Sequence, residues 1–127
     1  PGIVGEYLKL KPERGQRQVL YKLSDSPLLW NQRIAIVSTF TFIKNRDFID
    51  TIILSERFLN RYLSLPKPTM HDLMQKAIGW MLREMGKRDK DMLVQFLEKH
   101  ATTMPRTMLR YAIEKFSEEE RRDFMKR

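Results

Sequence analysis

The segment best suited to chemistry is the stretch of residues 75–84, QKAIGWMLRE. On a helix, Lys76 and Trp80 are four residues apart and Trp80 and Arg83 are three apart, so an indole lies between two cations on one face. Nucleic-acid binders use a flat aromatic surface flanked by positive charge to stack bases and to anchor the phosphate backbone. The spacing therefore makes this helix a candidate for a nucleic-acid contact.

A structural interpretation of the same segment stays open. In that interpretation Trp80 belongs to the core, Lys76 and Arg83 are solvated, and Gly79 is a contact between helices. Glycine inside a helix costs ~1 kcal/mol relative to alanine, so Gly79 needs a reason. Room for a ligand beside the indole is the functional reason, and close helix packing is the structural one.

Two other arginines are candidates for binding. Arg33 follows Trp30 by three residues. We expect Trp30 to be packed, whereas Arg33 can reach a phosphate or a buried carboxylate. Arg110 is the third candidate, because it occupies a matching position in a weak internal repeat. Cations at matching repeat positions would line one concave surface.

The repeat consists of the segments 33–36, 75–78 and 110–113, each with Ala-Ile after a polar or cationic residue. The alanines are 42 and then 35 residues apart, close to the ~40 to 47 residue period of HEAT and armadillo helix pairs. A small residue lets a neighbouring helix approach, and the isoleucine fills the core between layers. The repeat indicates a helical solenoid.

The spacing of apolar residues predicts about eight helices. They are expected at 2–10, 16–23, 28–43, 48–63, 71–85, 89–99, 105–116 and 118–126. Gly86 is the predicted end of the fifth, and Ser117 with Glu120 predicts a capping box at the last. Residues 34–41, rich in β-branched side chains, could instead form a strand. We predict an all-α fold, a HEAT-like solenoid forming one domain over residues 1–127.

Composition narrows the function classes. The net charge of +8 and the pI near 9.9 favour a polyanionic partner. Without cysteine there is no disulfide, thiolate metal site or cysteine nucleophile. His71 and His100 are 29 residues apart and form no zinc motif. The sequence shows no membrane span and no signal peptide, and we expect a cytoplasmic protein.

Four segments together resemble the C-terminal half of the DNA alkylation repair family, the HEAT-like alkylpurine DNA glycosylases. They are residues 1–8, 30–37, 75–84 and 104–113. The resemblance spans nearly the whole chain, and the helix at 75–84 is its most specific motif. It implies hydrolysis of the N-glycosidic bond of cationic N3- and N7-alkylated purines in duplex DNA, without a metal or organic cofactor.

The resemblance also implies roles for particular residues. Trp80 resembles the family's tryptophan that packs against the deoxyribose of the lesion, and Arg33 resembles the arginine that anchors the backbone beside it. Arg83 and Arg110 are weaker matches, expected at the helix surface or on the DNA backbone, and Lys76 joins them as a candidate DNA contact by its spacing from Trp80.

One feature of the family is missing. Its central carboxylate belongs to a Trp-Asp-x-Val-Asp motif that would lie immediately upstream of Pro1, and Asp25, Asp47 and Asp50 do not match that motif. We therefore expect this chain to be the C-terminal portion of a longer domain and to be inactive or severely impaired alone. An array cut in this way exposes an apolar helix face, which favours dimerisation or domain swapping.

Two alternatives belong to other classes of protein. One is a non-catalytic HEAT-like module that binds DNA or protein through its concave face. The other is a scaffold in which Trp80 is buried, and this predicts indole fluorescence that added DNA does not quench.

Overall fold

The computed structural model describes residues 17–127, and these residues form helices without any strand. The helices are α2 (Gln18–Ser24), α3 (Leu29–Ser38), α4 (Phe40–Lys44), α5 (Ile49–Leu63), α6 (Asp72–Arg88), α7 (Lys90–His100), α8 (Arg106–Ala112) and α9 (Glu118–Lys126). The all-α prediction is confirmed and the strand alternative for 34–41 is wrong. The helix expected at 2–10 lies outside the described residues. No helix in this part of the chain is long and apolar enough to cross a bilayer.

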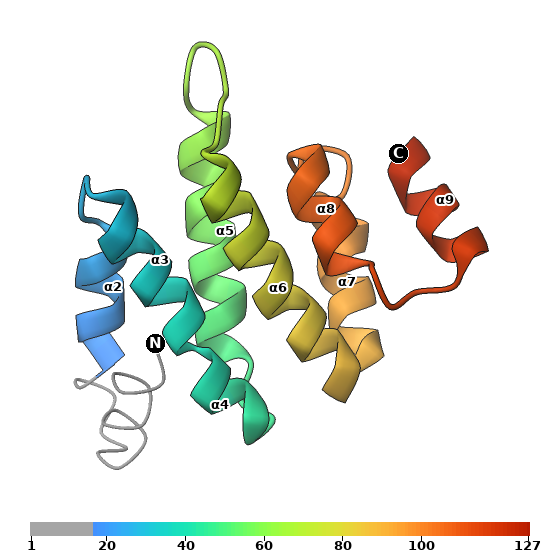
Figure 1. Ribbon diagram of the computed structural model, residues 1–127, viewed down its shortest axis with the longest axis horizontal. Helices are drawn as coiled ribbons and strands as arrows, with labels where there is room; N and C mark the ends of the chain where they lie inside the picture. The colour runs from blue at the N-terminus through green and yellow to red at the C-terminus, as the bar shows by residue number, and fades with distance from the viewer. Residues whose placement is uncertain (1–16) are drawn as a thin grey trace.

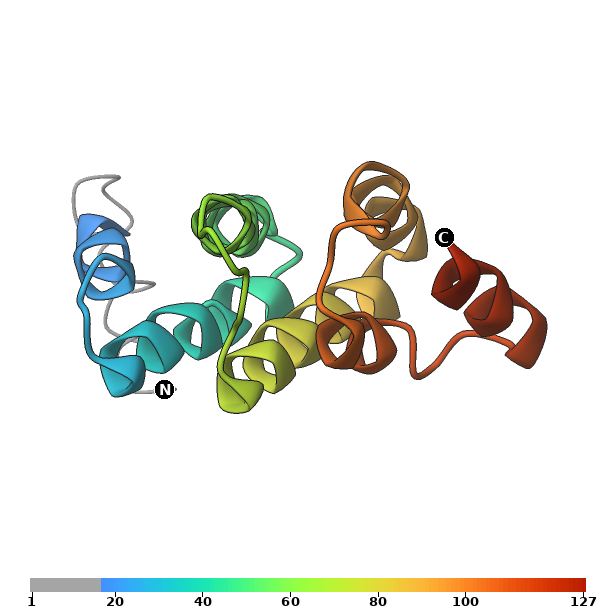
Figure 2. The ribbon, with the colours of Figure 1, turned by 90° about the horizontal axis from the view of Figure 1, so that it is seen from above.

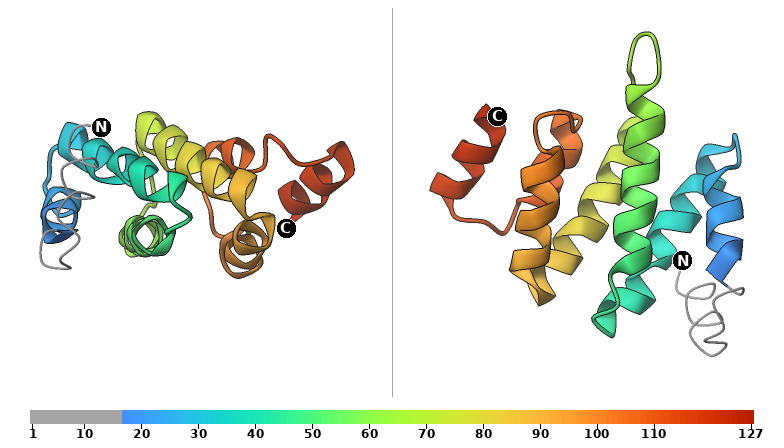
Figure 3. Two further views of the ribbon diagram at one scale, coloured as in Figure 1. Left: turned by 90° about the horizontal axis from the view of Figure 1, so that it is seen from below. Right: turned by 180° about the vertical axis from the view of Figure 1, so that it is seen from behind.

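The helices form two layers (Figure 1). Helices α3, α4, α6 and α8 make one layer, and α2, α5 and α7 make the other, as the view from above shows (Figure 2). The view from behind brings α2, α5 and α7 to the front, and α9 closes the end of the array next to α7 and α8 (Figure 3). This is the alternation expected of stacked helix pairs. The layer of α3, α4, α6 and α8 is called the inner layer below.

The repeated Ala-Ile pairs build the inner layer. Ala35, Ala77 and Ala112 are each at most 2% exposed and belong to α3, α6 and α8. Helix α6 packs more extensively on α8 than any other two helices pack on each other, and it also packs on α3. The burial of all three alanines agrees with the predicted role of the repeat, which is a small residue at each close approach between helices.

The other layer is held together more loosely. Helices α5 and α7 share little backbone contact. Long side chains join them instead, through the His100 Nε2 and Glu56 Oε2 atoms, which are 2.7 Å apart. Because the inner helices pack more closely than their partners behind, the array curves around the inner layer. The exposed side of α3, α4, α6 and α8 is its concave face.

The expected helix at 28–43 is interrupted. Helix α3 ends at Ser38 and α4 begins at Phe40. Between them, the Thr39 hydroxyl donates to the Ile36 carbonyl at 2.6 Å. A threonine side chain that bonds back to the preceding turn in this way bends a helix. Phe40 is the first residue after this break, at the start of α4.

Gly86 was expected to end the fifth helix, and this prediction is wrong. Helix α6 continues to Arg88, and no glycine in the described chain has a positive φ. A Cβ on Gly86 would lie 2.4 Å from a side-chain carbon of Leu93, so the glycine makes room for α7. The helix ends before Asp89, whose side chain accepts a hydrogen bond from the Met92 amide and caps α7.

The end of the chain agrees with the sequence prediction in part. Ser117 and Glu120 form the predicted capping box at the start of α9. Helix α8, expected to run to residue 116, stops at Ala112. The turn that follows brings Phe116 against Phe124 of α9, with ring centroids 5.8 Å apart. This aromatic contact fixes α9 on the array.

Candidate nucleic-acid interface

The concave face of α6 carries a stripe of polar and aromatic side chains. Lys76, Trp80, Arg83 and Lys87 recur at four- and three-residue steps, so they follow one line along the helix. The opposite side of α6 is buried in the core. The sequence therefore predicted correctly that Lys76, Trp80 and Arg83 share a face.

Trp80 combines the two interpretations given for it. It is half-buried and packs against the hydrophobic core. Its ring also contacts Phe40 of α4, with centroids 6.0 Å apart and planes tilted by 48°. Tilted aromatic pairs at this distance are favourable. Trp80 is thus anchored from behind and from the side, while the rest of the indole stays accessible on the concave face.

Gly79 and Gln75 in the same motif are structural. A Cβ on Gly79 would lie 2.5 Å from the Tyr111 Cβ and 2.7 Å from the Met108 carbonyl oxygen, so only glycine lets α8 pack here. The Gln75 side chain accepts from the Met108 amide at 3.3 Å and donates to the Met70 carbonyl at 2.9 Å. The reason for Gly79 is the contact between α6 and α8, not space for a ligand beside Trp80.

Arg33 lies on α3 with its guanidinium 5.9 Å from the centre of the Trp30 ring. Its Nε is buried and has no hydrogen-bond partner, and no carboxylate within residues 17–127 pairs with it. Buried N–H groups nearly always have a partner, so this one calls for an explanation. Trp30, expected to be packed, is 66% exposed, and that prediction is wrong because the side chain projects from the first turn of α3.

The remaining predicted cations have partners. The Lys76 ammonium is 2.8 Å from Asp72, and the hydrogen bond and charge of that carboxylate raise the pKa of Lys76. Arg83 pairs with Glu114 and lies 6.0 Å from the Tyr111 ring centre. Arg110 is exposed and donates to the Thr107 hydroxyl at 3.2 Å. All three project from α6 and α8, but Lys76 and Arg83 are each paired with a carboxylate.

Phe40 is a member of the face that sequence reasoning missed. Besides Trp80, its ring contacts two cations: the Lys44 ammonium is 5.1 Å and the Arg88 guanidinium 5.6 Å from its centre. The four-residue spacing of Phe40 and Lys44 in one helix is the signal that could have suggested it. Phe40, Lys44 and Arg88 are called the Phe40 corner below.

The carboxylates that could act near this face are engaged elsewhere. Asp47 and Asp50 pair with Arg17, and Asp50 also accepts from the Tyr21 hydroxyl. Burial, and then the hydrogen bond to Asp50, raise the pKa of Tyr21. Asp25 pairs with Arg57 and Arg61. These contacts tie α2 and the loop after it to α5.

Glu84 is the carboxylate one turn beyond Trp80. It is 7% exposed and bonds both Lys87 and Arg88, at 3.1 and 3.3 Å. Residues 17–127 also contain no group of three or more side chains able to hold a metal ion.

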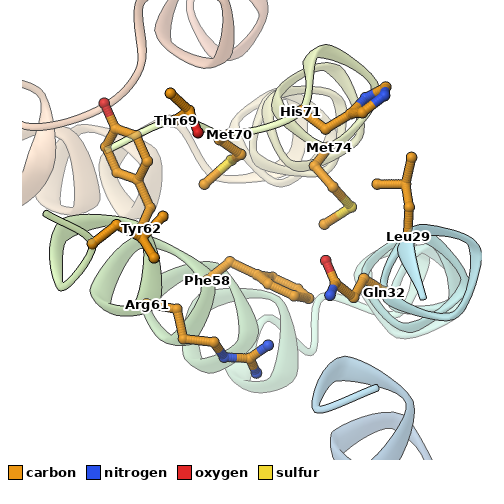
Figure 4. A pocket seen from close by; sticks show the side chains of 10 residues that line it. Leu29, Gln32, Phe58, Arg61, Tyr62, Thr69, Met70, His71 and Met74 are labelled. Atoms are coloured by element: carbon orange, nitrogen blue, oxygen red, sulfur yellow. The ribbon is translucent and has the colours of Figure 1, made fainter. Parts of the chain in front are cut away.

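A pocket of about 210 Å³ lies elsewhere, between α3, α5 and the start of α6 (Figure 4). Phe58, Met70 and Met74 give it an apolar lining, and Gln32 and His71 add polar groups at its edge. None of the predicted site residues lines it. The concave face, which is open, is therefore the candidate interface.

The arrangement is that of an all-helical repeat protein whose concave face combines aromatic rings with cations, of which Arg33 and Lys44 have no carboxylate partner among residues 17–127. A family model described as DNA alkylation repair enzyme matches residues 1–116. The chain belongs to this family, and the family places it among DNA repair enzymes. Comparison with curated proteins and with solved structures finds no match.

Proposed function

We propose that this chain is the nucleotide-holding part of a DNA glycosylase that removes cationic N3- and N7-alkylated purines from duplex DNA. The observation that carries the proposal is that the adjacent helices α6 and α3 carry Trp80, half-buried and supported by the Phe40 ring, and Arg33, whose Nε has no hydrogen-bond partner among residues 17–127. A DNA phosphate would supply the acceptor that Arg33 lacks. The membership of the DNA alkylation repair family supports the same conclusion.

The chemistry requires little of the protein. In an alkylated purine the base already carries a positive charge, so the N-glycosidic bond breaks with its electrons moving to the base, and water adds to the sugar carbon. The enzyme mainly has to stabilise the positive charge that develops on the sugar. The face of Trp80 can do so, because an aromatic face attracts a cation by ~0.5 to 2 kcal/mol.

The activating carboxylate is not expected within the described residues. Asp25, Asp47, Asp50 and Glu84 all bond cations of the fold. We propose that the family's carboxylate precedes Pro1 in the intact reading frame. Arg33 then anchors the backbone, Trp80 packs on the deoxyribose, and Lys76, Arg83 and Arg110 are contacts of lesser weight.

The test is base release from duplex DNA containing N7-methylguanine, by the product of the intact reading frame and by this chain. We expect release by the longer protein alone. Trp80→Ala in that protein should slow release by about 2- to 30-fold, the kinetic equivalent of the attraction of one aromatic face for a cation. Release by the 127-residue chain at the full rate would show that no upstream carboxylate is needed.

Arg33→Ala tests the anchoring role, and Arg121→Ala is its matched control, because Arg121 is exposed on α9. Arg33→Ala should weaken DNA binding and release, whereas Arg121→Ala should leave both unchanged. If neither protein releases base while salt-sensitive DNA binding persists, the chain is a non-catalytic binding module instead.

A further inference from the structure

The Phe40 corner brings two cations from separate helices to one aromatic ring. Lys44 lies one turn after Phe40 on α4, and Arg88 is the last residue of α6. Their charged groups lie 5.1 and 5.6 Å from the centre of the ring. The other side of the corner is Trp80, so the two charges stand directly beside the aromatic pair of the candidate interface.

Negative charge is in short supply at this corner. Lys44 is exposed and has no carboxylate partner within residues 17–127. Arg88 and Lys87 share one carboxylate, that of Glu84. Three cations therefore face a single acid, which leaves an excess of two positive charges.

The neighbouring charges do not remove the excess. Arg46 donates to the Arg88 carbonyl at 2.7 Å and lies 4.0 Å from Asp89, so these two neutralise each other. Interaction with helix dipoles accounts for cations in the last turns of α4 and α6. It does not account for the contact of both cations with one ring, because each dipole acts only at the end of its own helix and does not direct the two side chains toward each other.

We infer that Lys44 and Arg88 bind a backbone phosphate of DNA at the Phe40 corner, next to the nucleotide that packs on Trp80. Only the nucleotide at Trp80 is taken from the proposed function, and the phosphate site itself does not depend on it. The corner supplies a point charge from the lysine and a planar donor group from the arginine, and both suit a phosphate. Bound there and at Arg33, the backbone would be held by side chains of α3, α4 and α6.

The test is binding of this chain to undamaged duplex DNA over a range of salt concentrations, followed by fluorescence anisotropy of labelled DNA. Loss of one phosphate contact reduces the slope of log K against log salt by ~0.9. Lys44→Ala should show this reduction, and Lys44→Arg should restore the slope. Lys99→Ala is the matched control, an exposed lysine on α7 in the other layer, and should keep the original slope.

Equal slopes for Lys44→Ala, Lys99→Ala and the unaltered chain would overturn the inference. Lys44 is exposed, so thermal unfolding of Lys44→Ala should match that of the parent, and a reduced slope is then not a folding defect. Base release by the intact protein is measured in parallel. A reduced slope without base release would keep the phosphate site and remove the proposed glycosylase, while base release with an unchanged slope would do the opposite.

Discussion

The two halves of the inner layer contain the same kinds of side chain and use them differently. Where α3 and α4 meet α6, Arg33 and Lys44 stand beside the aromatic rings without carboxylate partners in the described chain. Where α6 meets α8, Arg83 stands beside Tyr111 but pairs with Glu114. Cations thus lie next to rings in both halves, but the cation beside Tyr111 is neutralised by Glu114, whereas Arg33 and Lys44 are paired with no carboxylate of residues 17–127.

The packing of α6 against its neighbours also differs between the two halves. Gly79 lets α8 approach α6 until no Cβ would fit, whereas Trp80 and Phe40 separate α6 from α4 with two rings. One half is closed by backbone contact and the other is left with an accessible aromatic surface. Within residues 75–84, Gly79 therefore supports the packing of the helices, whereas Trp80 belongs to the surface proposed to face the ligand.

Gly79→Ala should have the largest effect on stability. The added methyl meets the Met108 backbone and the Tyr111 Cβ, neither of which can move without shifting α8. We expect a loss of about 3 kcal/mol in the free energy of unfolding, at the upper end for overpacking. Urea denaturation measures it. In the control, Gly86→Ala, the methyl meets only the flexible Leu93 side chain, so equal losses for the two variants would contradict this account.

The two tryptophans give a second contrast. Trp80→Ala removes a half-buried ring packed on the core and should cost about 2 kcal/mol, less than a fully buried aromatic residue. Trp30→Ala removes a ring that is 66% exposed and should change stability by no more than about 0.5 kcal/mol. Urea denaturation of both variants measures these losses, and a loss for Trp30→Ala as large as that for Trp80→Ala would contradict the exposed position of the Trp30 ring.

Glu114→Gln should give the α6–α8 half of the inner layer a cation without a carboxylate partner, as in the half formed by α3, α4 and α6. Without its carboxylate partner, Arg83 becomes available to a phosphate on the concave face. DNA affinity should rise, and the slope of log K against log salt should steepen by at most ~0.9. Glu119→Gln, an exposed change on α9, controls for net charge. Equal effects of the two variants would show that only total charge matters.

The smallest expected effect concerns α9, outside both halves. The hydrogen bond from Lys90 and the capping bonds of Ser117 lower the pKa of Glu120. Their stabilising contribution is therefore complete above the ordinary glutamate value of 4.5 and is lost as the pH falls below it, through the lowered pKa. Amide hydrogen exchange in α9 should accelerate there. Glu120→Gln should remove this pH dependence, and its persistence would assign it to another group.

Much of the fold could be predicted because its signals are local. The Ala-Ile pairs, the capping box at Ser117 and Glu120, and the shared face of Lys76, Trp80 and Arg83 all depend on spacing within one helix. Spacing of this kind is set by helix geometry alone. These features are present in the structure as the sequence predicted them.

The failures concern contacts between elements that are distant in the sequence. The function of Gly86 depends on Leu93 in the next helix, and that of Gly79 depends on Tyr111. The pairing of Arg83 with Glu114 joins residues 31 positions apart, so a free cation and a neutralised one look alike in the sequence. Phe40 was missed because its contacts with Trp80 and Arg88 join residues that are 40 and 48 positions apart in the sequence.

The unequal closeness of the two layers has a mechanical consequence. On the inner side α6 and α8 touch through backbone at Gly79, while on the other side α5 and α7 are joined by the tips of Glu56 and His100. We therefore expect the concave surface of the array to be rigid and the convex surface to be more easily deformed. The array can tighten or relax its curvature around a rod-shaped partner by stretching the convex side, while the spacing of the rings and charges on the concave side stays fixed.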